Sequence, residues 1–259
     1  MVILLCLAMV ALMVPGYAGK TQKESKAGRY VSQRVEQVAD FREISVQDGV
    51  KVAFMQAAQT SLHVSGAQKW AQAVTVRVKQ GVLEIGLARP GVRPDKLKIA
   101  VTAPVLNGVT LAGESEFTVH GALQTEHLKV MLSGESEFSA DSVTVPHLTV
   151  MVRDRTEADI NRLNAGNVVA VAGGRGEVEL SGLAQQVRLE NDGSGEIDAA
   201  DLRAQTGEAL VKGKGEISIS AYETLVASVQ GKGKIKYKGT PVSLRQSGNI
   251  RHIVQDLDD

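Results

Sequence analysis

A seven-residue motif that occurs twice with almost no change constrains this chain more than any other feature. The segments 111–117 (LAGESEF) and 132–138 (LSGESEF) begin 21 residues apart. Looser copies of the motif, counted from its third residue, begin at Asp154, Gly174, Gly193, Gly213 and Gly231. Counted in the same way from Gly113, successive copies are 21, 20, 20, 19, 20 and 18 residues apart. A repeat of nearly fixed length predicts a solenoid, in which each repeat forms one coil that stacks on the next.

Apolar and polar residues alternate on both sides of each motif, as in Leu128-Lys129-Val130 and Ile217-Ser218-Ile219. A period of two predicts half-buried strands, so each repeat is two short strands joined at a corner, with a second turn in between. A coil of about 20 residues is too long for a hexapeptide-type helix and suits a wider, single-stranded parallel β-helix. A β-propeller, with about 40 residues per blade, would have to count two repeats as one and ranks second.

The motif itself occupies the corner of the coil. Its third and fifth positions carry mostly glycine, serine or threonine, which fit a tight bend or a close backbone approach. The predicted corner residues are Gly113, Gly134, Asp154, Gly174, Gly176, Gly193, Gly195, Gly213, Gly215, Gly231 and Gly233. Ser115, Ser136 and Thr156 replace the second glycine in the first three corners, so the geometry there stays open.

Stacked coils place like residues in columns. The predicted inner column contains Phe117, Phe138, Ala158, Val178, Ile197, Ile217, Ile235 and Ile250. The predicted outer column contains Glu116, Glu137, Glu157, Glu177, Glu196 and Glu216, followed by Lys234. Carboxylates stacked about 4.8 Å apart repel one another unless cations neutralise them.

Two sources of neutralising charge are available to this glutamate column. One is the neighbouring column of Arg155, Arg175, Lys214 and Lys232. The other is a bound divalent cation, because Asp159, Glu179 and Asp198 add a second acid two residues further on in three coils, and Ca²⁺ prefers such oxygen ligands. No aspartate-rich nonapeptide turn of the Ca²⁺-binding type is present, so we favour a solvated, cross-paired face, assign no metal site and keep Ca²⁺ as the alternative.

The segment Arg153-Asp154-Arg155 interrupts the glycine corners. Together with Glu135 and Glu137 of the preceding coil it offers acid/base groups and cationic clamps of the kind used to cleave polysaccharides. The interpretation we favour is that aspartate tolerates the left-handed backbone of the corner, and no catalytic residue is assigned. The candidate binding face comprises Glu116, Glu137, Glu157, Glu177, Glu196, Glu216, Arg153, Arg155 and Arg175.

Other candidate sites favour structural roles. His127 and His147 are expected to stack in a polar ladder with Asn167, because no third metal ligand is evident. Trp70 is expected to cover the N-terminal cap rather than to bind a sugar. The 29 basic and 29 acidic residues balance, and no phosphate loop, Ser/His/Asp set or nucleic-acid motif is present, so neither a nucleic acid nor an anionic membrane is an expected partner.

The chain divides into five parts. Residues 1–19 read as a signal peptide, with an apolar run over 2–14 that is too short to span a membrane comfortably and a cut near Ala18. Residues 20–40 are a polar lead, residues 41–104 are irregular β-coils or a cap, residues 105–250 are the regular repeats, and residues 251–259 are a tail, with 41–250 forming one domain. The only cysteine, Cys6, lies in the signal segment, so the mature chain has no disulfide or thiol chemistry.

Three segments resemble one known family: the opening Phe41-x-x-Ile44-x-Val46, the segment Val101-x-x-Pro104-Val105-Leu106, and the ending 231–241 (GKGKIKYKGTP). With the reiterated Gly-x-Gly corners, they resemble the auto-transporter adhesin "head GIN" domain family of exported bacterial proteins. The resemblance covers residues 41–250 and implies a right-handed parallel β-helix outside the cytoplasm. It brings no catalytic residues.

The sequence thus predicts an exported, non-enzymatic β-helix in the periplasm or at the cell surface. We expect it to bind a glycan or a cell-envelope component through its outer faces, without a cofactor and without a membrane span in the mature protein. A bare rod without long insertions suits extended contact. The alternatives are a carbohydrate-active enzyme of the lyase or hydrolase kind and a purely structural envelope protein.

Overall fold

The computed structural model describes residues 31–89 and 97–256, so the predicted signal peptide lies outside the described residues. Nearly all of the described chain is strand, apart from α1 (Gln68–Ala71) and the 3-10 helix η1 (Ile250–His252). The strands before the long coils are β1 (Val31–Glu36), β2 (Glu43–Val46), β3 (Lys51–Gln56), β4 (Ser61–Ala67), β5 (Val74–Lys79), β6 (Val82–Leu87), β7 (Lys98–Ala103), β8 (Gly108–Leu111), β9 (Glu116–Gln124) and β10 (His127–Leu132). The remaining strands are β11 (Glu137–Val152), β12 (Glu157–Ala172), β13 (Glu177–Asn191), β14 (Glu196–Val211), β15 (Glu216–Val229), β16 (Lys234–Lys238), β17 (Ser243–Gly248) and β18 (Ile253–Asp256).

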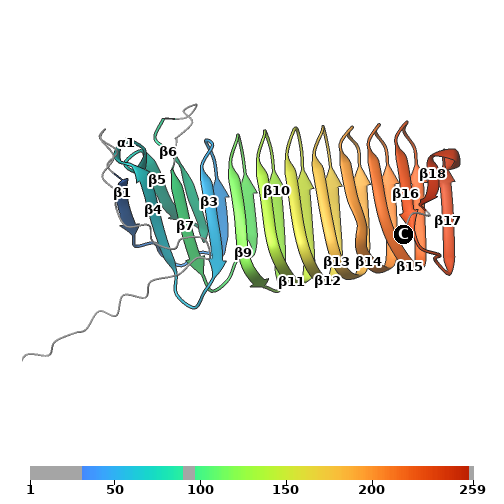
Figure 1. The fold of residues 1–259 in the computed structure, drawn as a ribbon, viewed down its shortest axis with the longest axis horizontal. Coiled ribbons are helices and arrows are strands. Elements are labelled where there is room, and N and C mark those ends of the chain that lie inside the picture. Colours follow the sequence, from blue (N-terminus) through green and yellow to red (C-terminus); the bar gives the residue numbers. More distant parts are fainter. Residues whose placement is uncertain (1–30, 90–96, 257–259) are drawn as a thin grey trace, which may run out of the picture.

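The repeats stack as parallel coils of a β-solenoid, as predicted (Figure 1). Each of β11 to β14 is one long strand that follows a whole coil between two corners. Pairing between β11 and β12 falls into three runs that begin at Glu137, Val143 and His147. Each coil therefore has three paired runs, where the alternation pattern had indicated two strands and one turn. Backbone hydrogen bonds continue through the corners, as from Glu135 N to Gly113 O (2.7 Å) and from Arg155 N to Gly134 O (3.0 Å).

The N-terminal coils do not follow chain order. β2 lies between β6 and β8, and β3 lies between β7 and β9, in parallel pairings throughout. The segment 43–56 thus forms a coil on which β8 and β9 stack, while the later β6 and β7 form the coil beyond it (Figure 1). Beyond these coils, β4 pairs antiparallel with β7, β1 pairs antiparallel with β4, and β5 pairs antiparallel with β6. This end of the sheet is therefore built from antiparallel strands.

Two segments that the sequence analysis left without structure are ordered strands. Residues 31–36, which fell in the predicted polar lead, form β1 on the edge of β4. Residues 253–256, which fell in the predicted tail, form β18, whose Ile253 is 8% exposed and pairs with Ile235. The inner column therefore ends at Ile253, and the prediction of Ile250 was wrong: η1 occupies the last corner and leaves Ile250 56% exposed.

The core runs along the axis of the solenoid and consists mainly of aliphatic side chains stacked from coil to coil. It includes a stack of three aromatic rings, all fully buried: Phe54, Phe117 and Phe138. Their centroids are 6.1 and 6.0 Å apart, with interplanar angles of 23° and 8°. Rings at this separation are stacked with an offset, which is a favourable arrangement for aromatic pairs. The parallel register creates this stack because it places equivalent inward positions above one another.

A candidate binding face on the solenoid

The predicted column of glutamates is present in the structure. Strand register pairs each of its members with the next, so that the six side chains project from the same position of consecutive coils. We call this the acidic face, defined by Glu116, Glu137, Glu157, Glu177, Glu196 and Glu216. Lysines end the column on both sides, because Lys51 pairs in register with Glu116 and Lys234 with Glu216. The face is therefore a patch of fixed length.

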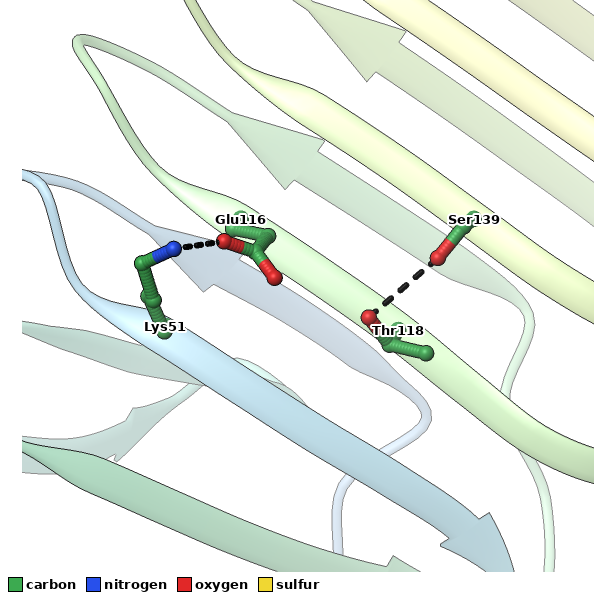
Figure 2. Close-up of polar contacts among 4 residues, drawn as sticks. All are labelled: Lys51, Glu116, Thr118 and Ser139. Atoms are coloured by element: carbon green, nitrogen blue, oxygen red, sulfur yellow. Dashed lines mark hydrogen bonds and ion pairs between the residues drawn. The ribbon is translucent and has the colours of Figure 1, made fainter.

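A second column runs beside the acidic face, two residues further along each strand. Its central members Asp159, Glu179 and Asp198 lie in register with one another, which doubles the carboxylates on three coils. Toward the N-terminal end the column changes to hydroxyls: Ser139 Oγ donates a hydrogen bond to Thr118 Oγ1 at 3.2 Å (Figure 2). Negative charge is therefore concentrated in the middle of the face.

Ion pairs neutralise only the ends of the acidic face. Lys51 pairs with Glu116 (Figure 2), and Lys236 Nζ lies 2.5 Å from Glu216 Oε1. For the middle members Glu137, Glu157, Glu177 and Glu196, the described residues provide no ion pair. The structure therefore does not show the expected ion pairs between these glutamates and the column of Arg155, Arg175, Lys214 and Lys232. The four carboxylates are exposed to solvent.

The charge distribution changes the acidity of the face. Partial burial, with the adjacent Glu137 and Glu177, raises the pKa of Glu157 above its ordinary value of 4.5. Partial burial, with Glu216 and Asp198, raises the pKa of Glu196 in the same way. These two glutamates take up a proton more readily than an isolated glutamate does, because the ionised form is poorly solvated and repelled by its neighbours.

Of the four residues expected to be neighbours at the interrupted corner, Arg155 and Glu135 meet. Arg155 forms an ion pair with Glu135 of the preceding coil, while Arg153 and Arg175 project into solvent. Glu135 is therefore engaged in an ion pair with the guanidinium of the next coil. This geometry gives no support to the hydrolase interpretation of the corner.

Asp154 adopts the left-handed backbone that its position requires, with φ of 64°. The glycines in the same place in neighbouring coils, Gly113, Gly134 and Gly174, have φ of 73°, 85° and 65°. The Asp154 carboxylate accepts a hydrogen bond from Gly134 N at 3.0 Å, which helps aspartate to hold this conformation. The left-handed backbone that the sequence analysis expected at Asp154 is therefore present.

The corners change type along the solenoid. In the first three, the buried hydroxyls of Ser115, Ser136 and Thr156 donate to the carbonyl three residues earlier, at 2.8, 3.1 and 2.8 Å. From the fourth corner on, glycine takes this place because backbones stack closely: a Cβ on Gly195 would lie 2.0 Å from Gly176 O, and one on Gly233 would lie 2.0 Å from Gly215 O. Hydroxyl-capped corners thus give way to close-packed glycine corners.

A buried asparagine, Asn191, precedes the corner one coil after this change, and the sequence analysis missed it. Asn191 is 0% exposed in an inward column that otherwise holds apolar residues such as Ala172 and Val211. Its Oδ1 accepts from Gly193 N at 3.0 Å, and its Nδ2 donates to Gly195 O at 2.9 Å and Glu216 O at 3.1 Å. The sequence did contain a signal for it, namely a polar residue at an inward position that is apolar in the neighbouring coils.

The remaining candidates lie where the strand register and the N-terminal cap place them. His127, His147 and Asn167 stack in register, and Asn167 Nδ2 lies 3.3 Å from His147 Nδ1. Within residues 31–89 and 97–256, no three His, Cys, Asp or Glu side chains converge as metal ligands. Trp70 is partly buried against the core, with Lys69 Nζ 4.6 Å from the ring centroid. None of the helices in the described part of the chain is long and apolar enough to cross a membrane.

A groove of about 570 Å³ lies where the last coils meet η1. We call it the C-terminal groove; it is lined by Glu177, Ser194, Gly195, Glu196, Lys214, Gly215, Glu216, Lys232, Gly233, Lys234, Arg251, His252 and Val254. The groove adjoins the acidic face, because Glu177, Glu196 and Glu216 belong to both. Sequence reasoning placed the three lysines in columns but could not predict Arg251 and His252 beside them, because η1 breaks the repeat.

Comparisons with known proteins agree with this architecture. A crystal structure of a putative adhesin from Bacteroides fragilis is 26% identical, covers 89% of this chain and 98% of its own, and superposes with a TM-score of 0.64. Two structures from Parabacteroides distasonis have TM-scores of 0.79: a putative adhesin (23% identity, 88% and 97% covered) and a protein described as a putative lipid binding protein (22% identity, 87% and 96% covered). No curated protein matches the chain.

The description of the matching family suggests an adhesin-like role and an exported protein. The family model matches residues 40–241, which is most of the chain. The chain therefore belongs to the family described as "putative auto-transporter adhesin, head GIN domain".

Proposed function

We propose that this protein is an exported, non-enzymatic adhesin that holds a polysaccharide of the cell envelope along the acidic face. The observation that carries the proposal is a row of carboxylates whose four middle members have no ion-pair partner in the described chain. Ionised carboxylates accept strong, charge-assisted hydrogen bonds, and sugar hydroxyls are suitable donors. Because the row repeats from coil to coil, a long polymer can make many equivalent weak contacts along it.

Calcium is a second way in which this face could hold a sugar. Asp159 Oδ1 is buried from solvent and has no hydrogen-bond donor among the described residues, and Glu157 projects beside it on the same strand. A bound Ca²⁺ would neutralise these carboxylates and accept sugar hydroxyls as further ligands. We therefore include calcium as a variable in the test.

The test incubates purified residues 20–259 with insoluble cell-wall polysaccharides and peptidoglycan, with Ca²⁺ or with EDTA. Retention of the protein and release of reducing ends are scored in the same tubes. The face variant is Glu157→Gln/Glu177→Gln, and its matched control is Glu126→Gln/Glu223→Gln, two exposed glutamates outside the face.

We expect retention without product release, lost in the face variant and kept in the control. Loss of retention in EDTA would add calcium to the mechanism. Product release would refute the non-enzymatic proposal, and equal retention of both variants would remove the acidic face from it.

A further inference from the structure

The C-terminal groove has a divided charge. Along the solenoid Glu177 and Glu196 come first, Lys214 and Glu216 share the next coil, and Lys232 and Lys234 follow in the coil after it. Arg251 and His252 of η1 close the end of the groove. The groove therefore offers carboxylate acceptors at one end and a cluster of cationic donors at the other.

The cations of the groove are unlike the other lysines at this end of the molecule. Lys212, Lys236 and Lys238 each pair with a carboxylate, on Glu190, Glu216 and Asp201 respectively. The four cations of the groove, Lys214, Lys232, Lys234 and Arg251, form no ion pair with any described residue, although glutamates line the same groove. Four unpaired cations around one cavity repel one another, and a bound anion would relieve that repulsion.

His252 fixes the wall that carries Arg251. Its Nδ1 lies 2.8 Å from Gly233 O, and because a carbonyl can only accept, Nδ1 carries the hydrogen and donates it. His252 N also donates to Asn249 O at 3.0 Å within the turn. These bonds hold η1 against the corner of the preceding coil, so the groove is formed before any ligand arrives and binding requires little ordering of the backbone.

We propose that the C-terminal groove binds an anionic group (a carboxylate, sulfate or phosphate) carried by a sugar. Lys214, Lys232 and Arg251 contact the anion, for which ammonium and guanidinium groups are strong donors. Glu196 and Ser194 accept hydrogen bonds from the hydroxyls of the same sugar at the other end of the groove. The sugar half of this assignment rests on the proposed function, whereas the anion half does not.

The experiment titrates the purified protein at low salt with galacturonate, galactose 6-sulfate, galactose 6-phosphate, galactose and inorganic phosphate, followed by calorimetry and amide chemical shifts. The groove variant is Lys232→Gln/Arg251→Gln. The matched control is Lys129→Gln/Arg203→Gln, which removes two exposed cations outside the groove. All four side chains are exposed, so neither variant is expected to alter folding, and circular dichroism checks this.

We expect at least one anionic sugar to bind and to shift the amides of Gly215 and Gly233, while galactose does not bind. The groove variant should weaken binding by about tenfold or more, because two charge-assisted contacts are lost, and the control should bind as the wild type does. Added salt should weaken binding in the wild type. Which of the three anionic sugars binds identifies the source of the charge.

Three results would overturn the inference. Absence of binding by every anion, or equal binding by the groove variant and the wild type, would refute the groove as an anion site. Binding of inorganic phosphate as tight as that of galactose 6-phosphate would refute the sugar half. If the wild-type protein binds the anion but is not retained by any polysaccharide, the proposed function is refuted instead, so the two failures are distinguishable.

Discussion

Asn191 offers the sharpest test of how the coils are held together, because it is a buried polar residue where the repeat calls for an apolar one. We expect Asn191→Val, which installs the residue type of Val211 in the next coil, to destabilise the protein. The side chain of Asn191 makes three hydrogen bonds to backbone groups of the corner and the following coil. An apolar replacement of similar size keeps the packing and removes all three bonds.

The magnitude follows from what each backbone group loses. Asn191 Oδ1 provides the hydrogen-bond acceptor of Gly193 N, and an unpaired N–H at a packed corner costs about 1–3 kcal/mol. The two carbonyls that accept from Asn191 Nδ2, Gly195 O and Glu216 O, each lose one donor, at about 0.5–1 kcal/mol each. Gly195 O retains its bond from Glu216 N at 3.1 Å. The sum is about 2–5 kcal/mol in the free energy of unfolding.

Equilibrium unfolding in urea, followed by far-ultraviolet circular dichroism, measures this change through the midpoint and the slope. The control is Asn164→Ala, an exposed asparagine of the same sheet, which we expect to change stability by less than about 0.5 kcal/mol. If Asn191→Val equals or exceeds the wild type in stability, then apolar packing governs this column and the hydrogen bonds contribute nothing net, which refutes the reasoning.

Three further predictions concern the core, the interrupted corner and the acidic face. Phe117→Ala should lower stability by about 3–5 kcal/mol, because it opens a cavity between two stacked rings, whereas Phe117→Leu should cost less; urea unfolding measures both. Asp154→Ala should lower the melting temperature and cost about 1–2 kcal/mol at its φ of 64°, while Asp154→Gly should be close to neutral, and a tolerated alanine would contradict the strain. Glu157→Gln/Glu196→Gln should stabilise the protein at pH 7 by less than about 0.5 kcal/mol per site after solvent screening, and this gain should shrink in salt and below pH 4.5. Because the pKa values of both glutamates are raised in the folded protein, their contribution to wild-type stability is present at low pH and is lost as the pH rises through these pKa values. If the variant and the wild type show the same dependence of stability on pH, the raised pKa values are contradicted.

The repeat made most of the fold predictable. Outward and inward positions alternate, and a fixed coil length then places like residues in register, so the acidic face and the inner column follow from counting. The N-terminal order was not predictable in this way. Segments 43–56 and 82–103 lack the glycine corner, and nothing local in their sequence indicates that β2 and β3 lie between coils that come later in the chain.

The C-terminal groove and the role of Asn191 escaped prediction for a different physical reason. η1 inserts residues into the last corner and moves the inward position from Ile250 to Ile253, so counting by the repeat misplaces Arg251 and His252. Asn191 occupies an inward position, where a pattern of apolar residues alone predicts nothing about hydrogen bonds to the next coil. Both features depend on contacts between coils that are made only after folding.

The fold alone does not require the acidic face. Lys51 and Lys234 occupy the same position as the six glutamates, in the same strand register, so the outward position accepts either charge. Alternating lysine and glutamate would have given favourable pairs between adjacent strands, whereas the sequence places like charges opposite one another, which is destabilising. The raised pKa values of Glu157 and Glu196 are the local expression of that cost. A repeated arrangement that costs stability and is not needed for the fold is a further reason to propose that this face binds a ligand.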